Sequence, residues 1–180
     1  MHGTNNHLVK KVAILGLDNS GKTSILLCLK GVKNLLSFYS LNPTKGIKVN
    51  KFKTLGTEFN IWDFGGQEQF RKDYLQNFNK HLKGTNKILF VIDIQDFERY
   101  NLALNYLKSL IDLLFKQNMQ IEFSIFLHKF DPDIEITHKN FDFKKIQKLI
   151  IDIKNLFPSN FMYTIHKSSI YTIFQKSSID

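Results

Sequence analysis

Residues 16–23 place two glycines, a lysine and a threonine at the spacing Gly-x-x-x-x-Gly-Lys-Thr. Glycines at Gly16 and Gly21 allow a loop to curl so that successive backbone N–H groups face a phosphate. In such a loop Lys22 reaches the β- and γ-phosphates of a nucleotide, and the hydroxyl of Thr23 coordinates Mg²⁺. The pattern therefore predicts a phosphate-binding loop. The other residues of this region that we expect to contact the nucleotide are Asp18, Asn19, Ser20 and Ser24.

A second motif, Ile-Trp-Asp-Phe-Gly-Gly-Gln-Glu, occupies residues 61–68. Asp63 is expected to hold Mg²⁺ through water, and the N–H of Gly66 to bond the γ-phosphate because no side chain blocks the approach. Gln67 then lies where it can orient an attacking water, which makes it the candidate catalytic residue. A phosphate loop alone does not distinguish a nucleotide hydrolase from a kinase. This second motif favours hydrolysis.

Thr44 lies between these motifs, in a Pro-Thr loop flanked by extended chain. Its hydroxyl is suited to Mg²⁺ and its N–H to the γ-phosphate, and both contacts would be lost on hydrolysis. An ordinary turn threonine is the alternative that such a short pattern leaves open. The expected magnesium ligands are Thr23, Thr44 and Asp63.

The elements that must position these motifs can be predicted from apolar spacing. Short apolar runs bounded by turn residues predict strands over residues 9–15, 47–52, 58–62, 87–94, 121–127 and 161–165. Helical spacing predicts helices over residues 22–29 and 141–156, a third in which Leu102, Tyr106, Leu110, Leu113 and Leu114 share a face, and a last one from Ile170 onward. The second and third strands are joined by a short link with a glycine, which predicts an antiparallel hairpin.

Strands that alternate with helices predict right-handed crossovers between parallel strands. We therefore expect an α/β fold with a mainly parallel six-stranded sheet, one antiparallel edge strand and helices on both faces. Ligands of such sheets bind at the carboxyl ends of the strands, where both motifs fall.

Length and charge limit the class of protein. The 180 residues fit one domain, which we expect to span residues 1–180 after a disordered leader at 1–7. The net charge is +9, but the only arginines are Arg71 and Arg99. Nucleic-acid readers favour arginine, so scattered lysines indicate a solvated surface and no nucleic-acid partner.

The sequence has neither an apolar run of the roughly 18 to 20 residues that span a bilayer nor the apolar region of a signal peptide. We expect a cytoplasmic protein. Its single cysteine, Cys28, lies in a stretch with helical apolar spacing, which predicts a buried structural thiol.

The phosphate motifs resemble those of the Ras superfamily, and in detail those of its Arf-like branch. Residues 16–23 and 62–68 look like Arf-family motifs, including Asp18 where Ras proteins carry glycine. Residues 97–103 are also similar to the segment that opens the third helix of Arf proteins. The resemblance implies a P-loop NTPase G domain.

Later segments are closer to the Rag branch. Residues 126–131 resemble the His-Lys-x-Asp motif of Rag GTPases, where most relatives have Asn-Lys-x-Asp. Residues 91–96 and 168–171 are Rag-like as well. Rag proteins continue into a dimerisation domain, so we expect either a lone G domain or a piece of a longer protein.

The resemblance implies which residues bind guanine. Asp131 would accept from N1 and the exocyclic amine, Lys129 would lay its stem along the ring, and the N–H of Ile170 would bond O6, next to Ser169. His128 departs from the common pattern, because an asparagine there bonds N7 and ties the base loop to the phosphate loop. A neutral imidazole can still donate one N–H, and a histidine that only caps the strand end is the alternative.

The resemblance implies a switch that binds GTP with Mg²⁺, hydrolyses it slowly to GDP, and regulates effectors through two switch loops. One alternative is a nucleotide-loaded scaffold with negligible hydrolysis, which Asp18 favours slightly because an anion near the γ-phosphate disturbs catalysis. A P-loop kinase is a further alternative, for which two arginines are too few.

The implied partners are protein effectors, an exchange factor and an activating protein. A G-domain homodimer or heterodimer stays open, and membrane contact would be peripheral and made through partners.

Overall fold

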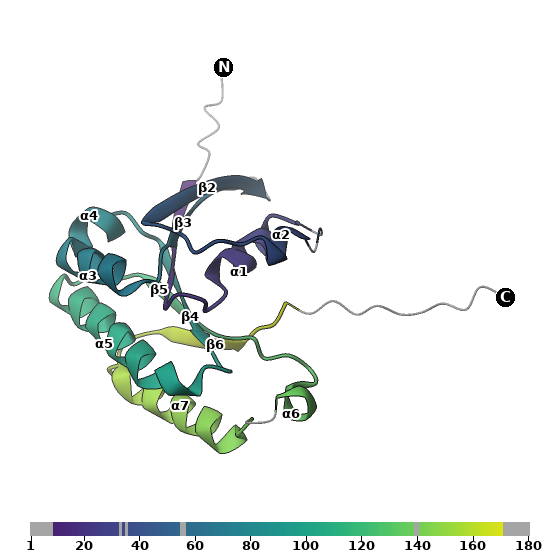
Figure 1. Cartoon of the computed structure of the whole chain (residues 1–180). Helices are drawn as coiled ribbons and strands as arrows, with labels where there is room; N and C mark the ends of the chain where they lie inside the picture. Colours follow the sequence, from purple (N-terminus) through teal and green to yellow (C-terminus); the bar gives the residue numbers. More distant parts are fainter. Residues whose placement is uncertain (1–8, 33, 35, 55–56, 139–140, 171–180) are drawn as a thin grey trace.

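The computed structural model describes residues 9–32, 34, 36–54, 57–138 and 141–170 (Figure 1). Three features predicted from the sequence lie outside these residues: the leader at 1–7, the hairpin turn at 55–56, and the last helix beyond residue 170. The assignment of one domain to residues 1–180 stays a prediction.

A single six-stranded sheet forms the centre of the fold, in the order β2-β3-β1-β4-β5-β6. Its strands are β1 (Val9–Gly16), β2 (Ile47–Thr54), β3 (Thr57–Phe64), β4 (Lys87–Asp93), β5 (Glu122–His128) and β6 (Tyr163–Lys167). Edge strand β2 pairs antiparallel with β3, and the other described pairings are parallel. The predicted sheet is therefore confirmed.

The last strand begins two residues later than predicted. The N–H of Phe161 donates to the carbonyl of Pro158 at 3.0 Å, so Phe161 belongs to a turn. Its ring packs 5.3 Å from that of Phe157, between centroids. The apolar character of Phe161 therefore reflects packing in the turn, and pairing with β5 starts at Tyr163.

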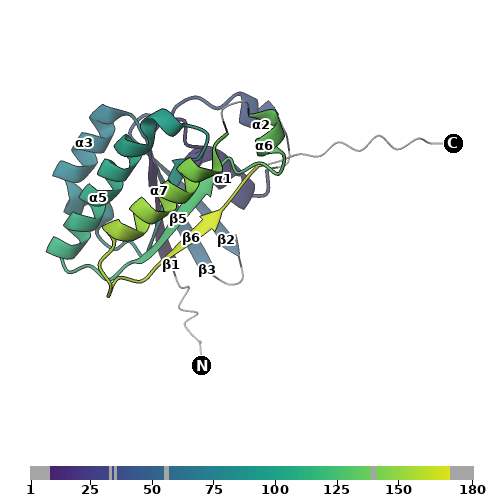
Figure 2. The same ribbon diagram turned by 90° about the horizontal axis from the view of Figure 1, so that it is seen from below.

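Helices cover both faces of the sheet, as predicted (Figure 2). Described helices are α1 (Lys22–Leu29), α2 (Leu36–Tyr39), α3 (Glu68–Gln76), α4 (Phe78–Leu82), η1 (Phe97–Arg99), α5 (Tyr100–Lys116), α6 (Ile134–Thr137) and α7 (Phe143–Leu156). The alternation of side chains along β1 divides the core. Ala13 and Leu15 join the cluster under α3, α5 and α7, whereas Val12 and Ile14 pack with α1.

One predicted helix face and one burial prediction differ from the structure. Leu102 is 41% exposed, because the inner face of α5 is centred on Ala103, Leu107 and Leu110. Cys28 is exposed as well, since the short helix α1 turns other residues toward the sheet. Among the described residues, no helix combines the length and apolar character that crossing a membrane requires.

Candidate functional site

The loop between β1 and α1 adopts a conformation that depends on its glycines. Gly16 has φ +145°, and a Cβ there would lie 2.3 Å from the carbonyl oxygen of Val91 in β4. Gly21 has φ +90° directly before α1. Asn19 between them is also left-handed, with φ +59°. The loop therefore folds back over the carboxyl ends of β1 and β4. A loop of this shape can present successive backbone N–H groups to a phosphate.

Lys22 is buried at the start of α1. Its Nζ donates to the carbonyl of Leu17 at 2.6 Å, within the loop itself. Burial lowers the pKa of Lys22 to about 8, and the charges of Asp63 and Asp18 oppose that shift. A phosphate beside this ammonium would compensate its lost hydration, which is the chemistry predicted from the motif.

Three predicted magnesium ligands meet at one point, although they come from three separate segments. The hydroxyls of Thr23 and Thr44 donate to Oδ2 of Asp63 at 2.7 and 3.0 Å, and the two hydroxyl oxygens are 3.1 Å apart. The other carboxylate oxygen of Asp63 is buried with no described hydrogen-bond partner. Such a cluster of hard oxygen donors fits Mg²⁺.

A cavity of about 330 Å³ opens beside this cluster. Its lining comprises Asp18, Asn19, Gly21, Lys22, Thr23, Ser24, Leu41, Asn42, Pro43, Thr44, Gly66 and Gln67. Gly66 touches the phosphate loop so closely that a Cβ would lie 2.1 Å from the backbone nitrogen of Asp18. The close approach explains why residue 66 must be glycine. Next to it, Oε1 of Gln67 is buried without a described hydrogen-bond partner.

Two further contacts join the Thr44 loop to the segment that carries Gln67. The N–H of Gly65 and the hydroxyl of Tyr74 both donate to the carbonyl of Gly46, each at 2.8 Å. On the other side, Nε of Arg71 donates to the carbonyl of Gly66 at 2.8 Å. Residues 44–46 and 65–74 are therefore held together as one unit.

His128, at the end of β5, is 3% exposed. It contacts both the loop after β6 and the phosphate loop. Its Nδ1 lies 3.0 Å from Oγ of Ser168. A Cβ at Gly21 would lie 2.3 Å from Cδ2 of the ring. Burial lowers the pKa of His128, so the neutral imidazole is favoured. The ring thus bridges the two loops by packing against Gly21. An asparagine at this position would make the same link with a hydrogen bond.

Asp131 is held by two side-chain donors. The hydroxyl of Ser169 donates to Oδ1, and Nε2 of Gln95 donates to Oδ2 at 3.1 Å. The same Gln95 amide also donates to the carbonyl of Lys129 at 2.8 Å. Sequence reasoning missed Gln95, although its position just beyond β4 lies at the same edge of the sheet.

Lys129 has φ +61°, and its Nζ forms an ion pair of 2.6 Å with Asp93 at the end of β4. The N–H of Phe130 donates to the carbonyl of Ser168 at 3.0 Å, which joins the loop after β5 to the loop after β6. Ile170 follows Ser169 in that second loop and is half-buried. The structure therefore brings the predicted base residues to one end of the sheet, next to the phosphate loop.

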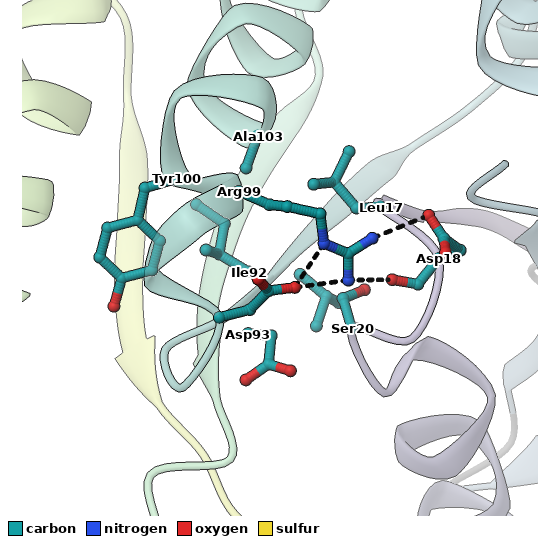
Figure 3. A pocket seen from close by; sticks show the side chains of 10 residues that line it. Leu17, Asp18, Ser20, Ile92, Asp93, Arg99, Tyr100 and Ala103 are labelled. Carbon is teal, nitrogen blue, oxygen red and sulfur yellow. Dashed lines mark hydrogen bonds and ion pairs between the residues drawn. The ribbon is translucent and has the colours of Figure 1, made fainter. Parts of the chain in front are cut away.

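Arg99 is the other residue that sequence reasoning missed. It belongs to η1 and forms ion pairs with Asp18 of the phosphate loop and with Asp96 (Figure 3). No local pattern signalled this contact, because Arg99 and Asp18 are 81 positions apart in the sequence.

Comparisons with known proteins agree with this geometry. Residues 11–178 match the family model described as the Gtr1/RagA G protein conserved region. The chain is 36% identical to the ADP-ribosylation factor-like protein alp41 of Schizosaccharomyces pombe over 102 residues, which cover 56% of this chain and 50% of that protein. It is 35% identical to human ADP-ribosylation factor-like protein 5A over 98 residues, or 54% and 50% of the two chains. The chain thus spans about half the length of these curated relatives.

A solved structure has the same fold. The Arl6 (BBS3) small GTPase of Trypanosoma brucei, determined with the bound nucleotide analogue GppNp, aligns with a TM-score of 0.65 and 22% identity. The alignment covers 89% of this chain and 87% of that one. Since the family model spans nearly the whole described sheet and both loop systems at its carboxyl edge, the chain belongs to the Gtr1/RagA G-protein family of small GTPases.

Proposed function

We propose that this protein is a molecular switch that binds guanine nucleotide with Mg²⁺ and hydrolyses GTP to GDP. The observation that carries the proposal is the convergence of Thr23, Thr44 and Asp63 beside the buried ammonium of Lys22. Family membership supports the same function.

Each residue of the phosphate site has a role in the proposed reaction. Lys22 and the backbone N–H groups of residues 16–23 bind the β- and γ-phosphates. Mg²⁺ held by the two threonines and Asp63 would neutralise negative charge on the phosphate oxygens. Gln67, at the rim of the same cavity, orients the attacking water.

The switch itself follows from the contacts of Thr44 and Gly66. Both residues would bond the γ-phosphate, so its loss releases the loops that carry them. Because Gly65 and Tyr74 tie α3 to Gly46, the two loops are expected to respond together. We expect effectors, an exchange factor and an activating protein to bind these loops, in the cytoplasm or peripherally on membranes through partners.

A nucleotide-loaded scaffold without hydrolysis is the main competing function. Kinase activity has less support, because both arginines are engaged within the protein, Arg71 with Gly66 and Arg99 with Asp18. Measuring phosphate release from bound GTP distinguishes the scaffold function from the switch function.

The test is single-turnover release of γ-phosphate from the wild type and from Gln67→Leu. We expect hydrolysis at least about tenfold slower in the variant, equivalent to about 1.4 kcal/mol in barrier, and GTP affinity within about twofold of wild type. Gln69→Leu is the matched control, since Gln69 is exposed on α3 and should leave the rate unchanged. Tight GTP binding without any phosphate release by the wild type would establish the scaffold instead.

A further inference from the structure

A single guanidinium group connects the start of α5 to the phosphate loop (Figure 3). Nη1 of Arg99 donates to Oδ1 of Asp18 at 3.1 Å, and Nη2 donates to the carbonyl of Asp18 at 3.2 Å. Nε and Nη2 also face Oδ2 of Asp96, each at 2.5 Å. Asp96 therefore fixes the orientation of Arg99, and Arg99 holds both the side chain and the backbone of Asp18.

Asp18 lies where its charge would act on a bound phosphate. It lines the same cavity as Lys22, Thr44 and Gln67, and its backbone nitrogen touches Gly66. The third phosphate of GTP is expected among these residues. A free carboxylate at this position would repel a γ-phosphate more strongly than it repels the shorter GDP.

Arg99 offsets this repulsion in two ways. Its positive charge is adjacent to the carboxylate, and its bond to Oδ1 fixes the direction in which the carboxylate points. The side chains of Arg99 and Asp18 are 32% and 43% exposed, so solvent screens the interaction and the effect is expected to be modest. Arg99 contacts both the side chain and the backbone of Asp18. The solvent-exposed ion pairs within the helices join side chains alone.

We propose that Arg99 is the built-in counter-charge of Asp18 and that this pair sets the preference of the phosphate site for GTP over GDP. This inference rests on the proposed function. Arg99 acts as a positioning residue, because the contacts that carry its proposed effect are those with Asp18.

The experiment measures the affinities for a non-hydrolysable GTP analogue and for GDP, both with Mg²⁺, in a cycle of variants. Arg99→Ala should lower the ratio of GTP to GDP affinity by about threefold to tenfold, and less at high salt. In the Asp18→Asn background, where residue 18 carries no charge, the same arginine substitution should change the ratio by less than about twofold.

Lys108→Ala is the matched control, because it removes an exposed ion pair of 2.6 Å with Asp112 on α5. The ratio should not change in this variant. Thermal unfolding checks that each variant folds, and Arg99→Gln replaces Arg99→Ala if the latter does not.

A purely structural role for Arg99 predicts equal losses for GTP and GDP, and that outcome would overturn the inference. A drop in the ratio that persists in the Asp18→Asn background would also overturn it. Failure of the proposed function is a different result, in which the wild type binds neither guanine nucleotide.

Discussion

At the scale of single residues, Asp131 is the group on which we expect the choice of base to depend. Ser169 and Gln95 each donate one hydrogen bond to its carboxylate, so the orientation of the carboxylate is fixed before any ligand binds. An ionised carboxylate has about four acceptor sites, which leaves two for the N1–H and 2-amino groups of guanine. Adenine has an acceptor at N1 and would leave the carboxylate unpaired.

Asp131→Asn should therefore lower GDP affinity by about 10² to 10⁴, which corresponds to two charge-assisted hydrogen bonds of about 1.5 to 3 kcal/mol each. The amide reverses the donor pattern, so preference should move toward xanthine nucleotides. Competition titrations with GDP, XDP and ADP measure both effects. His128→Asn is the companion variant and should change GDP affinity by a smaller factor. Equal binding of ADP and GDP by the wild type would contradict the guanine assignment.

Residue spacing predicted the contacts made by residues that lie in recognisable motifs, including the meeting of Thr23, Thr44 and Asp63, but not the contacts of Gln95 and Arg99. The separation between Gly16 and Lys22 is fixed by local loop geometry, so the phosphate loop can be recognised from the sequence alone. Gln95 and Arg99 act on residues 36 and 81 positions away. Such contacts depend on which strand ends become neighbours in the sheet, and no local pattern records that.

At the scale of elements, Tyr74 links helix α3 to the start of β2. Its ring packs edge-on against Phe64, with centroids 4.8 Å apart, while its hydroxyl bonds the carbonyl of Gly46. Burial raises the pKa of this hydroxyl to about 12. The hydroxyl therefore remains a donor at all pH values at which the protein would be assayed.

Tyr74→Phe removes this one hydrogen bond and keeps the ring. We expect a loss of about 0.5 to 1.5 kcal/mol in the free energy of unfolding, with faster amide exchange in residues 44–47 by hydrogen–deuterium exchange. Tyr100→Phe is a suitable control, because the hydroxyl of Tyr100 also bonds a backbone carbonyl, that of Ile94, at 2.6 Å. Tyr100→Phe should lower the free energy of unfolding by a similar amount without changing amide exchange in residues 44–47. Unchanged exchange in Tyr74→Phe would contradict a link between the two loops.

Long, strongly patterned elements were predicted well. β1, α1, β4, β5 and α7 lie within a few residues of their expected positions because their apolar runs have clear strand or helix periods. Helices α2, α4 and α6 are four or five residues long, too short for a helical period to be visible. The nine residues of α3 are mostly polar, and the sequence pattern did not reveal this helix.

At the scale of the whole molecule, nucleotide binding should be visible as stability. The site is assembled from segments at the ends of several strands, so a ligand that binds only the folded state opposes unfolding of the whole sheet. GDP with Mg²⁺ at about 100 times its dissociation constant should add about 2.7 kcal/mol. For a domain of this size, that corresponds to a rise of about 5 to 11 °C in the melting temperature.

Thermal unfolding with GDP and Mg²⁺, GDP and EDTA, and ADP and Mg²⁺ tests this expectation. Chelation should remove much of the shift, because Thr23 and Asp63 then lose the cation that they would share in the GDP state. ADP should produce little shift. A rise that is the same for ADP and GDP would show that the site does not select its base.

The position of β2 at the edge of the sheet has a consequence for self-association. Among the described strands it pairs only with β3, so its outer edge resembles a template for an added strand. Lys48 and Lys51 are exposed along this strand, and Lys53 is exposed as well but pairs with Glu58 of β3 at 3.7 Å. A second copy docking edge to edge would bring these ammonium groups together, at a cost that grows as the salt concentration falls. A strand rich in aspartate or glutamate would instead be attracted to these ammonium groups. The edge of β2 therefore disfavours edge-to-edge fibres of this protein and favours pairing with an acidic strand.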